Sequence, residues 1–302
     1  MRPLWTSAIA SAVFFVSGLS SSVSAINLYN GTANQTPDAQ LAAIRSGAIC
    51  TTLAPNTPPC NAAGNFPFPT PTSETVINGV GVRLDTAANL AEYSGYSNFN
   101  FNPLTNNFFN TTIFNSGTLN RVTGYSLDFK FRLDTVGSEV DNTNPRAVFS
   151  VLVVSSDNFA IELGFREGEI FAQSSNFTAE ANSAAFATTA LKDYRLTVSG
   201  SNYLLDEVTS PTTVSTILSG LLVQYTFVPA SSDPPLPFNP YTIPSFVFLG
   251  DNSGQASGEF TLGSVDLTPI PFDFSPTGGL LTLGAIAGAR HIRKKIKAKS
   301  KS

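Results

Sequence analysis

The sequence of 302 residues has one histidine, one tryptophan and two cysteines. His291 lies close to the C-terminus and Trp5 close to the N-terminus, so the long middle of the chain contains neither residue type. The absence of histidine there excludes a Ser-His-Asp triad, histidine general acid/base chemistry and histidine-ligated metals. It also leaves a cysteine nucleophile without its usual base.

Charge is scarce as well, since Asp, Glu, Lys and Arg make up 13% of the residues. Residues 26–269 contain nine Lys and Arg against twenty Asp and Glu, a formal charge of −11. A surface of this sign repels phosphate groups, which excludes nucleic acid as a partner. Most of the remaining basic residues form a tail at the C-terminus: Arg290, Arg293, Lys294, Lys295, Lys297, Lys299 and Lys301.

The N-terminal residues 1–25 have the layout of a secretory signal peptide. Arg2 precedes an apolar run over residues 4–19, and the sequence Val23-Ser24-Ala25 provides small residues for cleavage after Ala25. The alternative is a membrane anchor that stays attached, although the apolar run is short for a span. We therefore expect an exported protein.

Residues 26–75 form an N-terminal extension that contains both cysteines. Cys50 and Cys60 lie in a segment rich in proline and threonine. In an exported protein an isolated pair most simply closes a surface loop as a disulfide. Half of a metal site is the alternative, but no suitable third ligand lies nearby in the sequence.

Residues 269–302 combine a proline-containing motif, an apolar stretch and the basic tail. Ser275 and Pro276 suit the N-cap and first position of a helix. Residues 276–289 carry no charge, and Ile292 and Ile296 extend them toward the length of a transmembrane helix. The basic tail would then stay cytoplasmic. A basic amphipathic helix lying on the membrane is the alternative.

The body of the chain, residues 76–268, reads as antiparallel β-structure. Residues 125–133 alternate between apolar and polar, and residues 147–154 form a continuous apolar run. Gly168 predicts a hairpin between strands at 159–165 and 170–173. Further strands are expected at 194–198, 203–205, 220–227, 245–249 and 259–267, two helical turns at 37–44, and an exposed loop at 229–244. The pattern predicts an all-β, antiparallel β-sandwich or jelly roll.

Three acidic residues around the hairpin are the candidates for catalysis. The alternation places Glu162 on the polar face, away from the core, and Glu167 and Glu169 at the turn. Sandwich glycosidases use paired carboxylates, but a hairpin with a charged solvent face is the simpler interpretation. We therefore predict no catalytic residues.

Acidic and amide residues also suggest a candidate calcium site. The loop expected before Ala147 contains Asp134, Glu139, Asp141, Asn142 and Asn144, and Asp251 and Asn252 follow a late strand. Oxygen ligands at one end of a sandwich suit Ca²⁺, yet these residues are also common in turns. No other cofactor is expected. The candidate aromatic platforms for sugar are Tyr93, Tyr96, Tyr203, Tyr225 and Tyr241, although burial within the strands is the more common fate of such tyrosines.

The three-part C-terminus resembles the sorting signal of exosortase substrates, the PEP-CTERM type, in a variant similar to cyanobacterial forms. The residues of the motif are Pro269, Pro271, Phe272, Asp273, Phe274, Ser275 and Pro276. It departs from the Pro-Glu-Pro consensus because no acid separates Pro269 from Pro271. The resemblance implies transit through the inner membrane, an exosortase-type processing enzyme as partner, and delivery to the envelope or extracellular matrix.

A second resemblance concerns the body. The hairpin over residues 159–172 is similar to the central hairpin of laminin-G and concanavalin A-like lectin sandwiches. Segments 84–87, 92–96, 146–157, 161–165 and 246–251 resemble the choice-of-anchor domains of bacterial envelope proteins. These likenesses imply the fold and leave the ligand open.

Three hypotheses follow for the function. The first is a non-enzymatic exported protein of the cell envelope or matrix that binds a polysaccharide or a surface component. The second is a structural matrix or adhesion protein without a defined ligand. The third is a secreted glycan-active hydrolase that uses Glu162 with an acid from another strand.

Overall fold

A computed structural model describes residues 24–46, 73–86, 94–98, 114, 117–139, 146–175, 178–226, 239–252 and 256–270. Cys50, Cys60, most of the signal peptide, the motif after Pro269, the apolar stretch and the basic tail lie outside these ranges. Within them, no helix is long and apolar enough to cross a membrane. The expectations for those segments therefore stay predictions.

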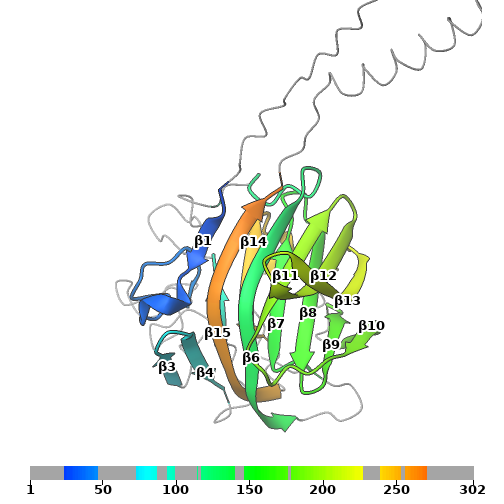
Figure 1. Cartoon of the computed structure of the whole chain (residues 1–302). Helices are drawn as coiled ribbons and strands as arrows, with labels where there is room; N and C mark the ends of the chain where they lie inside the picture. The colour runs from blue at the N-terminus through cyan, green and yellow to red at the C-terminus, as the bar shows by residue number, and fades with distance from the viewer. Residues whose placement is uncertain are drawn as a thin grey trace, which may run out of the picture. The chain divides into compact units, whose positions relative to one another are not determined.

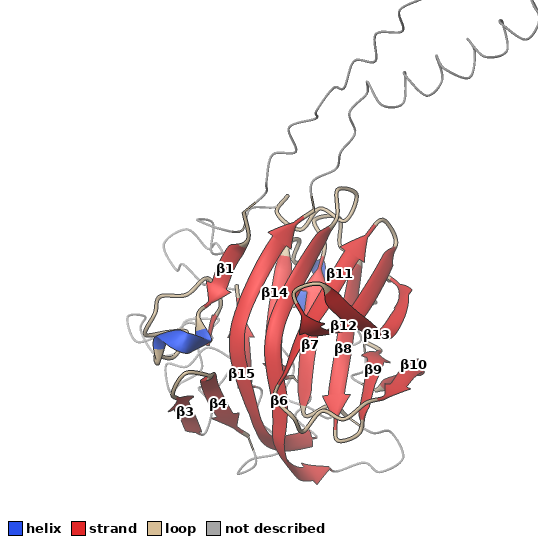
Figure 2. Cartoon of the chain, viewed as in Figure 1, coloured by secondary structure: helices blue, strands red, loops and turns tan. Residues whose placement is uncertain are grey.

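The described strands form two antiparallel sheets in two layers (Figures 1 and 2). Sheet A has the order β13-β12-β11-β6-β15-β4-β3, and β1 also pairs with β15. Its strands are β1 (Ile26–Tyr29), β3 (Ser73–Ile77), β4 (Gly81–Asp85), β6 (Tyr125–Glu139), β11 (Lys192–Ser199), β12 (Asn202–Ser210), β13 (Thr213–Leu221) and β15 (Ala256–Pro269). The prediction of an all-β sandwich is confirmed.

Sheet B has the order β10-β9-β8-β7-β14-β5-β2. Its strands are β2 (Arg45–Ser46), β5 (Ser94–Ser97), β7 (Phe149–Val154), β8 (Ala160–Arg166), β9 (Glu169–Gln173), β10 (Ala179–Ala185) and β14 (Phe246–Asp251). Gly168 makes the turn between β8 and β9 with a positive φ of 77°, as the sequence predicts.

The core lies between the sheets and is rich in aromatic rings. The apolar residues of β6 alternate inward, so that Phe129 stacks on Tyr194 with ring centroids 5.3 Å apart. Phe131 stacks on Phe149 of the opposite sheet at 4.0 Å. Alternating inward side chains from both layers are the expected origin of such a core.

Several strands differ from the sequence-based prediction. The last strand before the proline-rich segment is β13, Thr213–Leu221, and not residues 220–227. Residues 222–226 instead leave sheet A, and Val223 forms a bridge with Ala160 of sheet B. The sequence predicts helical turns at 37–44, but the structure has isolated hydrogen-bonded turns there. The φ of Leu41 is 53°, outside the helical range, so a helix does not continue.

The sandwich also begins earlier in the chain than residue 76. β1 pairs with β15, with Ile26 opposite Leu267, and β3 starts at Ser73. A strand as short as β1 shows too little hydrophobic periodicity to be predicted from sequence, so its pairing with the long β15 decides its structure.

Candidate functional site

The outer face of sheet B, which points away from the core, is the unexpected feature of the fold. Every residue of β7 and β14 is buried, so these strands are covered on both faces. The buried outer residues of four adjacent strands include Ser150, Leu152, Val154, Glu162, Gly164, Phe171, Gln173, Phe246 and Phe248. Glu162 points away from the core as predicted, but the prediction that this face is solvated is wrong.

Part of the cover comes from two segments distant in sequence. Residues 222–226 carry Tyr225, and the short 3-10 helix η2 (Pro240–Thr242) carries Tyr241. The two tyrosine rings stack with centroids 4.6 Å apart. The sequence predicts an exposed loop over residues 229–244, yet Pro240 and Tyr241 are buried. Asn239 explains this local structure, because its side chain accepts a hydrogen bond from the Tyr241 backbone and caps η2.

Glu162 is fully buried and accepts three side-chain hydrogen bonds. The Tyr241 hydroxyl donates to Oε2 at 2.5 Å, and the Gln173 amide donates to Oε1 at 3.2 Å. The Asn252 amide also donates to Oε1. Ser150 completes this network by donating to the amide oxygens of Asn252 and Gln173. We call Ser150, Glu162, Gln173, Tyr225, Tyr241 and Asn252 the Glu162 cluster.

Tyr225 joins the cluster through the backbone. Its hydroxyl accepts from the Glu162 N–H and donates to the Gln173 carbonyl, each at 3.0 Å. The phenol therefore fills the place where the ladder between β8 and β9 ends. Burial, followed by the charges of Glu162 and Glu180, raises the pKa of Tyr225. The charges of two carboxyl groups thus raise the pKa of the same phenol.

The electrostatics of Glu162 follow from its enclosure. Burial raises the pKa of Glu162 from 4.5 to about 7, against the hydrogen bonds from Tyr241 and Asn252, which lower it. Burial and the neighbouring Glu162 in turn raise the pKa of Tyr241. A carboxyl group with this pKa is available as both proton donor and proton acceptor near neutral pH.

An open hollow of about 560 Å³ lies farther along β8. It is lined by Val136, Arg166, Glu167, Gly168, Glu169, Ser183 and Ala185. Arg166 donates to Glu169 at 2.7 Å. Burial raises the pKa of Glu169, but hydrogen bonds from Ser183 and Arg166 outweigh it and lower the pKa overall. Glu167 is exposed at the turn, as predicted.

The described calcium candidates Asp134, Glu139 and Asp251 do not belong to a cluster that suits a metal. Asp134 and Glu139 belong to β6, which is longer than predicted, and not to a loop. Asp134 contacts Arg132 and Thr261 on the outer face of sheet A, each at 2.5 Å. Asp251 is buried and accepts from Thr86 at 2.8 Å. Asp141, Asn142 and Asn144 lie outside the described residues, among which no cluster of three or more His, Cys, Asp or Glu suits a metal.

The tyrosines considered as sugar platforms are mostly buried. Tyr96 and Tyr241 are enclosed, and Tyr203 accepts a hydrogen bond from Asn182 at 2.7 Å. Tyr225 is half-buried, and Tyr93 lies outside the described residues. The described tyrosines therefore have the buried or half-buried positions that the sequence analysis favours over a sugar platform.

No protein family model matches the chain, and no curated protein matches it. The solved structures that resemble it include a GH43 protein of Bacillus licheniformis, BlXynB, with 11% identity and a TM-score of 0.38 over 66% of this chain and 35% of that chain. Alginate lyase A1-II′, a member of polysaccharide lyase family-7, has 11% identity and a TM-score of 0.37 over 70% and 87%. A sialidase of Trypanosoma rangeli has 8% identity and a TM-score of 0.34 over 67% and 27%.

These comparisons correct one prediction. The sequence predicts a protein that is not an enzyme, whereas the similar structures include a lyase and a sialidase. The exclusion of catalysis is therefore withdrawn. The chain spans about a third of the length of the GH43 protein, and at such TM-scores the likeness assigns neither reaction nor ligand to this chain.

Proposed function

We propose that this protein is exported and cleaves a polysaccharide, with Glu162 as the carboxyl group that transfers the proton. The observation that carries the proposal is the pKa of about 7 for a buried carboxyl group whose Oε2 contacts the Tyr241 hydroxyl. Perturbed carboxyl groups of this kind concentrate at functional sites. The surrounding residues of the cluster carry no formal charge.

The hydrogen bonds give the two carboxyl oxygens different roles. Gln173 and Asn252 both donate to Oε1 and hold the carboxyl plane in place. Oε2 faces Tyr241, so proton exchange takes place on that side. Hydrolysis of a glycosidic bond uses an acid that protonates the leaving oxygen and a second carboxylate that either attacks the sugar carbon or activates the attacking water. Glu180 is the candidate for the second role, because its charge reaches Tyr225.

Access to Glu162 requires a movement. Tyr241 is 2% exposed and contacts the carboxyl group directly, so a sugar reaches Oε2 only when η2 moves off sheet B. The open hollow at Arg166 lies four residues along β8 from Glu162, roughly 13 Å in an extended strand. This distance would accommodate neighbouring sugars of the same polymer.

The test is product release from a panel of neutral and uronic acid polysaccharides. Reducing ends report hydrolysis, and the ultraviolet absorbance of an unsaturated product reports elimination. Glu162→Gln keeps the shape of the side chain and should lower the rate about 100-fold or more. The matched control, Asp128→Asn on the outer face of sheet A, should keep the rate. A fully active Glu162→Gln protein, or no product from any polysaccharide, would reject the proposal.

A second candidate function is polysaccharide binding at the open hollow. The observation that favours it is that Arg166, Glu167 and Ser183 line an open surface, whereas Glu162 is enclosed. In that case, immobilised polysaccharide retains the wild-type and Glu162→Gln proteins equally, and Arg166→Ala weakens retention. Equal retention of Arg166→Ala would exclude the hollow.

Export itself is tested by the intact mass of the protein from its native envelope. We expect removal of residues 1–25, and removal of the segment that follows the motif if an exosortase-type enzyme processes it. A mature chain that keeps residues 1–25 would contradict the predicted signal peptide.

A further inference from the structure

One end of the sandwich contains both ends of the described chain. β1 starts next to the end of β15, because Ile26 pairs with Leu267, and the chain leaves sheet A after Pro269 (Figure 1). The connections at this end, together with the strand residues next to them, comprise residues 117–124, 155–159, 199–202, 221–226 and 239–245. We call these connections, together with residues 24–25 and 269–270, the tether end.

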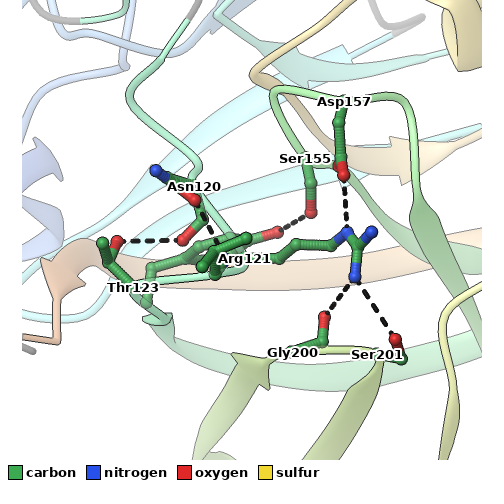
Figure 3. A network of polar contacts seen from close by, with 9 residues as sticks. Asn120, Arg121, Thr123, Ser155, Asp157, Gly200 and Ser201 are labelled. Carbon is green, nitrogen blue, oxygen red and sulfur yellow. Dashed lines mark hydrogen bonds and ion pairs between the residues drawn. The ribbon is translucent and has the colours of Figure 1, made fainter.

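The tether end has almost no charge. Among its described residues, Arg121 and Asp157 are the sole charged side chains, and they pair at 2.8 Å. Arg121 also donates to the Gly200 carbonyl at 2.9 Å and to Ser201 at 3.3 Å, and Figure 3 shows it between these loops. It thereby ties a loop of sheet B to a turn of sheet A, and its charge is neutralised within the surface.

Exposed aliphatic side chains gather at the same end. Among the described residues, seven large hydrophobic side chains are exposed, and four of them belong to the tether end. Val122 is 63% exposed, Leu221 66%, Val223 39% and Ile270 36%. Their loops contact one another, since Gly200 donates to the Arg121 carbonyl and Leu222 donates to the Ser201 carbonyl. Exposed apolar groups on neighbouring loops are typical of an interaction surface.

The opposite end of the sandwich is different. It carries the charged turn with Arg166, Glu167 and Glu169, and the ion pair of Lys192 with Glu207. A charged end is costly to bring into a lipid interface, whereas a neutral end with aliphatic groups is not. The two ends are therefore suited to different surroundings.

The sequence beyond Ile270 identifies the partner. Pro276 follows Ile270 by six residues, which span at most about 20 Å. From Pro276 the chain has fourteen residues without charge and then the Arg and Lys tail, the pattern of a membrane segment. We infer that the tether end lies against a lipid bilayer, with Val122 and Leu221 in the interface. This inference rests on the predicted membrane segment and is independent of the polysaccharide activity.

The experiment measures contact between single tryptophans and lipid in the full chain, reconstituted into vesicles that contain brominated acyl chains. Trp5→Phe removes the native tryptophan. Val122→Trp then places the probe at the tether end, and Val214→Trp is the matched control. Val214 is 48% exposed and lies at the opposite end of sheet A.

We expect brominated lipid to quench the fluorescence of the Val122→Trp protein at least twofold and to leave the Val214→Trp protein unchanged. Adding Leu221→Asp to the Val122→Trp protein should reduce the quenching, because it places a charge in the interface. If the protein floats with vesicles but Val122→Trp is not quenched, or both probes are quenched equally, the inference is wrong. If the protein does not float with the vesicles, the result contradicts both the inference and the predicted membrane segment.

Discussion

The outer faces of the two sheets differ in the surroundings of their charged side chains. On sheet A, Asp128 pairs with Arg195 at 2.6 Å and Lys130 with Asp193 at 3.2 Å, and these side chains remain partly exposed. On sheet B, Glu162 has no basic partner among its described hydrogen bonds and no exposed surface. The same alternation of apolar and polar residues therefore leads to a solvated face in one sheet and an enclosed cluster in the other.

The difference shows that alternation identifies which side of a strand faces away from the core, but not what lies beyond it. Water screens the charges on sheet A, so their pairs contribute little to stability. On sheet B, two tyrosines replace water, and the carboxyl group keeps its proton to a higher pH. Four predictions sharpen this comparison.

The largest effect is expected from Glu162→Ala at pH 5. It leaves the donors of Tyr241, Asn252 and Gln173 buried without their acceptor, which should lower the free energy of unfolding by about 3 to 5 kcal/mol. Urea denaturation measures this change. A loss as small as that of a surface substitution would show that water enters the cluster.

The second prediction concerns pH. The folded protein holds the proton of Glu162 up to a pKa of about 7, against an ordinary value of 4.5. The protonated Glu162 therefore contributes its full stabilisation to the folded protein below pH 4.5. This contribution, roughly 3 kcal/mol, is lost as the pH rises through about 7. Denaturation of the Glu162→Gln protein across this range should lack that loss. Parallel pH curves for the two proteins would contradict the raised pKa.

Tyr241→Phe is expected to have a smaller effect. It removes the hydroxyl that donates to Oε2 and should cost about 1 to 2 kcal/mol at neutral pH. Because this hydrogen bond lowers the pKa of Glu162, its loss should move the pH midpoint of the stability change upward. Tyr203→Phe, which alters a phenol outside the cluster, is the control and should leave the midpoint in place.

The smallest effect is expected on sheet A. Asp128→Ala breaks the ion pair with Arg195, and the free energy of unfolding should fall by less than about 1 kcal/mol. Added salt should reduce this difference further, since these side chains are partly exposed. A loss as large as that of Glu162→Ala would remove the contrast between the two faces.

The sequence was sufficient where local pattern decides the structure. The alternation predicted the first nine residues of β6, and the turn at Gly168 predicted the hairpin of β8 and β9 at nearly its observed position. β10 was missed because Ala179–Ala185 has no apolar side chain larger than alanine and depends on its pairing with β9. Strand pairing is a tertiary effect that a single sequence does not display.

The Glu162 cluster could not be predicted for a similar reason. Tyr225, Tyr241 and Asn252 are 63, 79 and 90 residues from Glu162 in sequence. One indication was present, since β7 and β14 are apolar on both faces, which implies that sheet B is covered. That pattern indicates that the outer face of sheet B is covered, but it does not show which residues cover it.

The long strand β15 gives the chain a mechanical property. Its C-terminal end leads directly to the segment predicted to hold the protein at a membrane, and eleven register pairs join it to β6. A pull on that segment acts along the strand, so these pairs are loaded together in shear and do not open one after another. A strand inside sheet A, between β6 and β4, is therefore the part of the fold that would bear a load on that segment.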